Sequence, residues 1–240
     1  MSSVEGKVVI VVPTYIEAEN LPRLAERIFA LDMPKSSMIV VDDASPDGTS
    51  TVARELDRHY KGRVAVIERE DKLGLGTAYV RGFSQALEDG AEYVVQMDAD
   101  LSHAPEYIPG FIEALETADV VIGSRYTTGG GVDEEWNLKR RLLSSLANQA
   151  IRIVSGVKVK DATTGFKAFR ATALGSLNLE GFRCRGFGFQ AEVAYACQEM
   201  GHKVVERPIV FHDRTAGKSK MSLGIIIEAM WKLTVIRWRR

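Results

Sequence analysis

The sequence predicts a single α/β domain built on a mostly parallel, doubly wound sheet with helices on both faces. Over the first half of the 240-residue chain, short β-branched runs alternate with amphipathic stretches, an order typical of repeated strand–helix units. The runs are nearly continuously apolar, as expected for strands that are covered on both faces. No internal repeat and no low-complexity linker interrupts the sequence.

Five apolar runs mark the expected strands of this first half. The first run ends at Pro13, the second ends at Asp42 and Asp43, and the fourth leads directly into Asp98. The predicted strands are residues 8–12, 38–41, 64–67, 93–97 and 120–122.

Residues at helical spacing follow each of the first four runs. Leu21, Leu24 and Ile28 share one face of the first expected helix, and Asp47 is placed to cap the second. The predicted helices lie around residues 21–28, 49–60, 80–87 and 108–115.

The order of elements changes after the glycines at 129–131. The pattern then predicts a long helix, a loop, a second helix and a strand. These elements are expected over residues 136–154, 190–200 and 204–211.

Polar clusters stand at the carboxyl ends of the expected strands. In doubly wound sheets ligands bind beyond those ends, so the clusters predict one shared ligand site. They are residues 14–17, Asp42 with Asp43, residues 98–100, and Ser124 with Arg125.

Charge is unevenly distributed, although the formal net charge is only −1. Residues 201–240 carry nine Lys or Arg against three acids, a net charge of +6 that leaves −7 on residues 1–200. A basic end on an otherwise acidic chain favours an anionic partner such as lipid, phosphate or nucleic acid. The candidate site residues favour lipid and phosphate, and we expect no nucleic-acid partner.

The composition also indicates the compartment. Cys184 and Cys197 are the only cysteines and are expected as reduced thiols in a cytosolic protein. The sequence has no signal-peptide pattern, and no window reaches the roughly 18 to 20 apolar residues of a membrane span. We therefore expect a cytoplasmic protein that meets a membrane peripherally.

Two aspartates flank one alanine at the end of the fourth expected strand. Asp98 and Asp100 would repel each other at this spacing, and a divalent cation bound between them relieves the repulsion. Oxygen ligands favour Mg²⁺ or Mn²⁺, which also bind phosphate oxygens. A solvent-exposed strand-end pair is the alternative, and the other acidic strand ends argue against it. Ser102 is expected either to cap a helix or to join the shell of the metal.

The ends of the first two strands are expected to form a nucleotide pocket. A carboxylate at Asp43 can accept hydrogen bonds from the ring N–H groups of a base, whereas Asp42 is expected to bond to the turn. Pro13, Tyr15 and Glu17 would form the wall and floor of this pocket. Glu17 equally suits the first turn of the following helix, where the helix dipole favours a carboxylate.

A glycine-rich loop at residues 74–77 precedes the third expected helix. It resembles a phosphate-cradling loop, but it lacks the third glycine at dinucleotide spacing and follows the third strand instead of the first. A close-packed loop is therefore expected.

Cations suited to a diphosphate or an incoming phosphate are spread over the second half. For any one of them, an ordinary basic loop or helix is the alternative. His103 and His212 are expected as surface or helix-end histidines, with no nucleophilic triad around either. The cations are Arg125, Arg140, Arg141, Arg214, Lys218 and Lys220.

The last segment combines apolar residues at helical spacing with Trp and basic residues. An interfacial helix on anionic lipid has this composition, and a C-terminal core helix with a basic end is the alternative. We expect a catalytic domain over residues 1–221 and the interfacial helix over residues 222–240. Its apolar side would carry Leu223, Ile226, Ile227, Met230 and Leu233, bordered by Trp231 and Trp238.

Together these motifs resemble the family 2 inverting glycosyltransferases, and among them the dolichyl-phosphate (polyprenyl-phosphate) mannosyltransferases. The resemblance runs from about residue 8 to residue 220, nearly the whole chain. The motifs that carry it are residues 12–15 (VPTY), 41–49 (VDDASPDGT), 72–79 (KLGLGTAY), 97–103 (MDADLSH), 123–126 (GSRY), 140–141 (RR) and 213–220 (DRTAGKSK).

The resemblance implies a GT-A fold, GDP-mannose as the donor, Mg²⁺ or Mn²⁺, and a polyprenol monophosphate acceptor. It also implies a place on the cytosolic face of a membrane, reached by peripheral docking or through a small membrane subunit. The helix near residues 138–155 and the C-terminal helix would be two amphipathic interface helices.

Site residues also follow from the resemblance. Some relatives carry Gln where Ser102 stands and use it as a metal ligand; Ser102 is shorter, so an intervening water is expected. The resemblance implies nucleoside contacts at Pro13, Tyr15, Glu17, Val41 and Asp43, diphosphate and metal contacts at Asp98, Ala99 and Asp100, and phosphate contacts at Arg125, Arg214 and Lys220. It implies acceptor-phosphate contacts at Arg125, Arg140, Ser144 and Arg214.

The expected chemistry needs no general base. A phosphate monoester has its second pKa near ~6, so it is already a charged nucleophile at neutral pH. In-line attack on the anomeric carbon would give an inverted, β-linked product while the metal stabilises the departing GDP. The expected catalytic residues are Asp98, Asp100, Arg125, Arg214 and Lys220.

Two other functions stay open. A polyprenyl-phosphate glucosyltransferase that uses UDP-glucose fits the same motifs, because nothing in the residues distinguishes guanine from uracil or mannose from glucose. A catalytically silent membrane-docking module is the second, and the joint presence of Asp98, Asp100 and the basic run argues against it. A sugar-nucleotide pyrophosphorylase is excluded, because residues 14–17 lack the Gly-rich, basic loop that it needs after its first strand.

Overall fold

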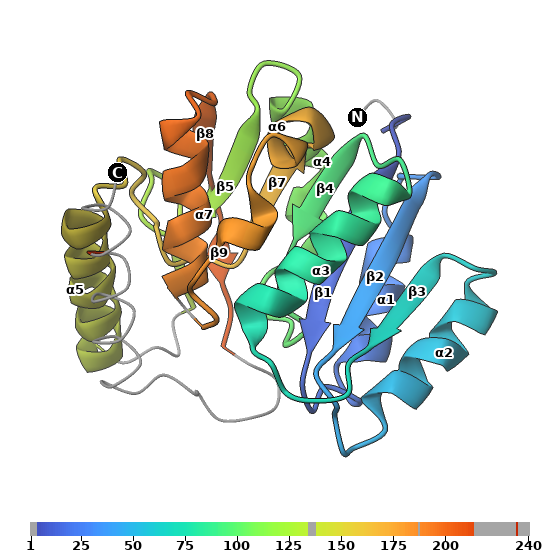
Figure 1. Ribbon diagram of the computed structural model, residues 1–240. Coiled ribbons are helices and arrows are strands. Elements are labelled where there is room, and N and C mark those ends of the chain that lie inside the picture. Colours follow the sequence, from blue (N-terminus) through green and yellow to red (C-terminus); the bar gives the residue numbers. More distant parts are fainter. Residues whose placement is uncertain (1–3, 134–137, 187, 214–233, 235–240) are drawn as a thin grey trace.

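The computed structural model describes residues 4–133, 138–186, 188–213 and 234 (Figure 1). Its centre is a seven-stranded sheet with the strand order β3-β2-β1-β4-β7-β5-β8. Neighbouring strands run parallel except at β7, which is antiparallel to both β4 and β5. The strands are β1 Val8–Thr14, β2 Ser36–Asp42, β3 Val64–Glu68, β4 Tyr93–Gln96, β5 Val120–Ser124, β7 Lys167–Arg170 and β8 Val204–Pro208. The predicted doubly wound, mostly parallel sheet is confirmed.

Helices cover both faces of this sheet (Figure 1). Helices α1, α2 and α4 pack on one face and α3, α6 and α7 pack on the other, while α5 lies beside α7 at one end of the molecule. The helices are α1 Leu21–Phe29, α2 Thr49–His59, α3 Leu75–Glu88, α4 Ile108–Ala114, α5 Leu138–Ser155, α6 Ala171–Gly175 and α7 Gly188–Glu199, with 3₁₀ turns at Pro105–Tyr107 and Leu179–Gly181.

Alternate side chains of each central strand supply the two halves of the core. On β1, Val8, Ile10 and Val12 pack with α1, α2 and α4, whereas Val9 and Val11 pack with α3 and α7. Successive residues of a strand point to opposite faces, so a strand covered on both faces is apolar at every position. This is why the first strands are visible in the sequence as continuous runs.

The sequence predicts a loop where the structure has β7 and the short helix α6. β7 is four residues long and reads Lys-Ala-Phe-Arg, so neither its length nor its polarity distinguishes it from a loop. Its first side chain, Lys167, is fully buried. Its last, Arg170, donates from Nε to the carbonyl oxygens of Leu115 and Ala118, at 2.7 and 3.1 Å. The charged residues of β7 thus find internal partners that no local pattern predicts.

The single strand predicted over residues 204–211 is divided in the structure. β8 ends at Pro208, and β9 (Val210–Phe211) pairs instead with β6 (Gly131–Val132) in a separate two-stranded sheet. Ile209 joins the two sheets: its N–H donates to the carbonyl oxygen of Ser124 at 3.1 Å, and its own carbonyl oxygen accepts from Gly131 N at 2.9 Å.

The two expected interface helices differ in what the structure describes. The long helix expected over residues 136–154 is found as α5. The helix expected over residues 222–240 lies outside the described residues, apart from Thr234. Within the described ranges, no helix is both long enough and apolar enough to cross a membrane.

Candidate active site

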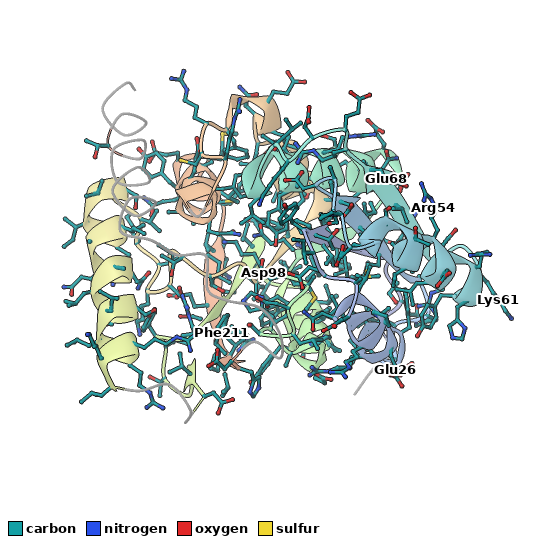
Figure 2. The ribbon with its side chains drawn as sticks, turned by 90° about the horizontal axis from the view of Figure 1, so that it is seen from below. Glu26, Arg54, Lys61, Glu68, Asp98 and Phe211 are labelled. Atoms are coloured by element: carbon teal, nitrogen blue, oxygen red, sulfur yellow. The ribbon has the colours of Figure 1, made fainter. Side chains whose placement is uncertain are left out.

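A cavity of about 190 Å³ opens at the carboxyl ends of β1, β2 and β4. Seen from the side of those strand ends, Asp98 lies near the middle of the molecule (Figure 2). Most of the residues expected to hold the nucleotide and metal meet in this cavity. It is lined by Pro13, Thr14, Tyr15, Glu17, Asp43, Lys72, Gly74, Leu75, Ala78, Asp98, Ala99 and Asp100.

Three non-glycine residues adopt left-handed backbone conformations in the turns around this cavity. They are Ile16 (φ 62°) after β1, Ala44 (φ 56°) after β2 and Leu101 (φ 62°) after β4. Such conformations are costly and persist where surrounding contacts impose them. Asp42 supplies several of those contacts, and its role in the turn is as predicted. Its carboxylate accepts from Thr14 Oγ1 (2.8 Å), Ser45 N (3.0 Å) and Ser45 Oγ (2.6 Å).

The Asp98 carboxylate is partly exposed to the cavity and partly held by the protein. Its side chain is 32% exposed. The hydroxyl of Tyr79 on α3 donates to Asp98 Oδ1 over 3.1 Å. Burial, and then the negative charge of Asp98, raise the pKa of Tyr79, so this hydroxyl stays a donor. Tyr79 lies in a motif noted in the sequence, but nothing there indicated that it bonds to Asp98.

Asp100 and Ser102 form the buried side of the same turn. Asp100 is 5% exposed, and its Oδ1 accepts from Ser102 N at 3.1 Å. The hydroxyl of Ser102 is fully buried and has no hydrogen-bond partner among the described residues. A buried hydroxyl without a partner is unfavourable, so a bound group or water is needed to satisfy it.

The residues present fit a divalent cation of the Mg²⁺ type. Two carboxylates offer hard oxygen ligands, and such ions commonly take one or two carboxylates together with phosphate oxygens and water. No cluster of three or more His, Cys, Asp or Glu able to hold a metal occurs among the described residues.

Asp43 lines the cavity with both carboxylate oxygens already hydrogen-bonded. Oδ1 accepts from Arg69 Nη1 (2.5 Å) and Oδ2 accepts from Gly74 N (2.8 Å). Arg69 also donates to Thr77 Oγ1 at 2.7 Å, so it links β2 to the start of α3. The expected close-packed loop is confirmed, because a Cβ on Gly74 would come 3.0 Å from the carbonyl oxygen of Arg185. Arg69 was missed in the sequence because it lies outside every motif.

The other expected nucleoside residues divide into lining and core positions. Tyr15 lines the cavity, and Lys72 Nζ lies 3.4 Å from its ring centroid in a cation–π contact. Glu17 lines the cavity and also accepts from Asn20 Nδ2 at 2.8 Å. The alternative place in the first turn of the helix is wrong, because α1 begins at Leu21 and its first turn contains no acidic residue. Val41 does not line it: its side chain is fully buried against Gly82 of α3.

Arg125 is committed to a buried ion pair with Asp161. Nε donates to Asp161 Oδ2 and Nη2 to Oδ1, both at 2.8 Å, and Nη2 also donates to Thr163 Oγ1 at 2.7 Å. Burial by itself would raise the pKa of Asp161, but the charge and hydrogen bonds of Arg125 outweigh it and lower that pKa. Asp161 lies in the segment expected as a loop, and no sequence signal marks it as the partner.

The acceptor residues expected on α5 are paired with neighbouring elements. Arg140 donates from Nη1 and Nη2 to the carboxylate of Asp213, at 2.7 and 3.0 Å. Ser144 Oγ lies 3.1 Å from the hydroxyl of Tyr126. Arg214 and Lys220, like Lys218, lie outside the described residues.

The expectation of a surface position for His103 is wrong. Its side chain is 1% exposed and lies between the rings of Phe166 and Phe211, at centroid distances of 5.1 and 5.2 Å. Its Nδ1 accepts a long hydrogen bond of 3.4 Å from Asp98 N. Burial lowers the pKa of His103 and favours the neutral ring. His212, by contrast, is exposed as expected.

Relatives with assigned names match nearly the whole chain. One is 41% identical over 232 residues and is named undecaprenyl-phosphate mannosyltransferase, from Micrococcus luteus; the match covers 97% of this chain and 93% of the relative. Another is 41% identical over 228 residues and is named polyprenol monophosphomannose synthase, from Mycolicibacterium smegmatis; the match covers 95% and 85%.

Solved structures share the fold. Glucosyl-3-phosphoglycerate synthase from Mycobacterium tuberculosis, in complex with Mn²⁺, UDP and glucosyl-3-phosphoglycerate, aligns with a TM-score of 0.66 at 17% identity, covering 97% of this chain and 80% of that one. The same enzyme with Mg²⁺ and UDP aligns with a TM-score of 0.68 at 18% identity, covering 97% and 79%. The expected GT-A fold is thereby confirmed. The family model described as glycosyl transferase family 2 matches residues 9–177, and this chain belongs to that family.

Proposed function

We propose that this protein transfers mannose from GDP-mannose to a polyprenol monophosphate, with inversion at the anomeric carbon and with Mg²⁺ or Mn²⁺ bound at Asp98 and Asp100. One observation carries the proposal. In a family 2 chain, a single cavity brings the Asp98-Ala99-Asp100 turn together with Tyr15 and Asp43.

Sugar and acceptor are inferred from the relatives. Both relatives at 41% identity are named for mannosyl transfer to a polyprenol phosphate, and they match this chain almost from end to end. The UDP-containing structures are under 20% identical and support only the fold. Mannose is therefore preferred over glucose, and GDP-mannose over UDP-glucose.

The metal would supply positive charge to the departing diphosphate. Asp98 and Asp100 would hold the metal, and the hydrogen bond that the Tyr79 hydroxyl donates would keep Asp98 in place. Ser102, whose N–H donates to Asp100, would bond a water of the metal shell, which would also satisfy its buried hydroxyl.

A lipid phosphate needs no base from the protein, because it arrives already ionised. His103 is not available as one, since its ring is enclosed by Phe166 and Phe211 and its Nδ1 accepts from Asp98 N. Direct attack of the phosphate on the anomeric carbon, opposite the departing GDP, inverts that centre. The role of the protein is then to orient two anions and to neutralise their charge.

The acceptor phosphate is assigned to Arg140 and Ser144, with Arg214 as a further contact from the basic run. The Arg140–Asp213 pair is partly exposed, so a phosphate can exchange for the Asp213 carboxylate at low cost. Arg125 would act differently from the expectation, because its guanidinium is already hydrogen-bonded to Asp161 and Thr163. Lys220 is retained as a donor-phosphate contact.

Helix α5 would lie against the membrane that contains the acceptor. It exposes five large apolar side chains, an arrangement suited to the headgroup boundary of a bilayer. The second interface helix, over residues 222–240, and a small membrane subunit remain parts of the same proposal, as does a place on the cytosolic face. The exposed side chains are Leu138 (82%), Leu142 (59%), Leu143 (54%), Leu146 (54%) and Ile153 (68%).

A transfer assay with radiolabelled donors tests the proposal. The purified protein is incubated with polyprenyl phosphate, Mg²⁺ or Mn²⁺, and labelled GDP-mannose or UDP-glucose, and organic-extractable product is counted. Label from GDP-mannose is expected. Label from UDP-glucose alone would replace the mannosyl assignment with the glucosyl one, and no label from either donor would favour the silent docking module.

A further inference from the structure

A lysine lies fully buried beside the proposed metal site, and the proposed chemistry does not use it. Lys167 begins β7 and pairs in register with Gln96 of β4, two residues before Asp98. Its side chain has no solvent exposure. Its ammonium donates to the carbonyl oxygen of Thr164 at 2.6 Å and to Oε1 of Gln190 at 2.7 Å.

The fold by itself does not require a charge at this position. Within the described residues both acceptors of the Lys167 ammonium are neutral amide oxygens, and no carboxylate forms an ion pair with it. Burial lowers the pKa of Lys167 to about 7, against the opposing charges of Asp161 and Asp98. An apolar side chain of similar volume would avoid this desolvation penalty.

The Thr164 carbonyl group, which accepts from Lys167, is adjacent in sequence to the backbone that contacts the proposed metal site. Thr164 precedes Gly165, and the Gly165 backbone lies against the Asp98 carboxylate. A Cβ on Gly165 would come 2.9 Å from Asp98 Oδ2 and 3.0 Å from Oδ1. The Gly165 backbone and the Tyr79 hydroxyl therefore both limit how the Asp98 carboxylate can turn.

We propose that Lys167 is a positioning residue for this site: its ammonium fixes the Thr164–Gly165 backbone, and that backbone fixes the Asp98 carboxylate in the orientation that binds metal and donor diphosphate. The inference rests on the proposed function, because it assumes a metal at Asp98. The inference would explain why β7 begins with a charged residue, which formation of the sheet alone does not explain.

The test is Mn²⁺ binding, followed by electron paramagnetic resonance, with the full chain and GDP present. Lys167→Met keeps the volume and removes the ammonium. We expect it to weaken Mn²⁺ binding on the order of tenfold, as for other groups that orient a metal ligand. Its melting temperature should change little, because the loss of a buried charge offsets the loss of the donor to the Thr164 carbonyl oxygen. In the transfer assay, the Mn²⁺ concentration for half-maximal rate should rise while kcat at saturating Mn²⁺ largely recovers.

Gln190→Leu is the matched control from the same buried cluster. It removes the other acceptor of Lys167 but leaves the Thr164 contact, so it should lower the melting temperature and leave Mn²⁺ binding unchanged. A merely structural Lys167 would give the reverse for Lys167→Met: a lower melting temperature with unchanged Mn²⁺ binding, which overturns the inference.

The outcomes separate this inference from the proposed function. If the unsubstituted protein binds no Mn²⁺ in the presence of GDP, the metal site itself is wrong. If it binds Mn²⁺ and Lys167→Met binds it equally well, only the role of Lys167 is wrong. Should Lys167→Met fail to fold, Gly165→Ala tests the contact between the Gly165 backbone and the Asp98 carboxylate. Unchanged Mn²⁺ binding by that variant contradicts the inference.

Discussion

Two arginine–aspartate ion pairs have the same chemistry in different environments. The side chains of Arg125 and Asp161 are 9% and 0% exposed, whereas those of Arg140 and Asp213 are 38% and 33% exposed. A buried pair is costly to break because one charge is left without a partner, while solvent weakens an exposed pair and replaces either partner easily. We therefore expect the first pair to stay fixed and the second to be able to exchange for a phosphate.

The largest effect is expected away from both pairs, at the carboxylates of the cavity. Asp100→Ala should lower kcat by about 10³-fold, because the charge that develops on the departing diphosphate loses its metal. Transfer rates at saturating donor measure this effect. Retained metal-dependent turnover would mean that the metal is held elsewhere.

The buried pair should dominate stability. Asp161→Asn is expected to lower the free energy of unfolding by about 3–5 kcal/mol, because Arg125 stays buried without a counter-charge. Urea denaturation gives the value. Asp213→Asn is the control at the exposed pair and should cost less than about 1 kcal/mol. Equal losses from the two variants would remove the distinction between the pairs.

The exposed pair should instead govern the acceptor. Arg140→Ala should raise KM for polyprenyl phosphate by about tenfold, the loss of one charge-assisted contact, with little change in stability. Asp213→Asn should leave this KM unchanged or lower it, since it removes a competitor for Arg140. An unchanged KM in Arg140→Ala would move the acceptor phosphate to another group.

The smallest effect is a pH dependence at the buried pair. Because Arg125 lowers the pKa of Asp161 below its ordinary value of 3.8, the pair contributes stability that is fully present above about pH 4. That contribution is lost as pH falls through the lowered pKa, when the folded carboxylate finally takes up a proton. The stability difference between the unsubstituted protein and Asp161→Asn should therefore shrink below pH 4. A constant difference would show that charge is not its source.

The first half of the fold was predictable because its strands are covered on both faces. Val8 to Val12, for example, are apolar without a break and report their burial directly. β7 has no such apolar pattern. Its charged residues Lys167 and Arg170 are accommodated by hydrogen bonds to Gln190 and to carbonyl oxygens that are distant in sequence. A local sequence pattern shows a continuous apolar run, but it does not show a hydrogen bond to a residue that is distant in sequence.

The same division applies to the site. The cavity residues Tyr15, Asp43, Asp98 and Asp100 follow strand ends and were predicted together. Partners contributed by other elements were not, because nothing near them in the sequence specifies the contact. Tyr79 with Asp98, Arg69 with Asp43, and Asp161 with Arg125 are such pairs. The Val41 side chain is buried and does not line the cavity, since a strand-end position alone does not determine which face a side chain occupies.

Metal removal is the most direct test of a metal-assisted transfer at Asp98 and Asp100. The protein is treated with EDTA, desalted, and assayed with labelled GDP-mannose and polyprenyl phosphate before and after Mn²⁺ is returned. Extractable label should disappear on EDTA treatment and return with Mn²⁺. Transfer at an undiminished rate in the metal-free protein would contradict it.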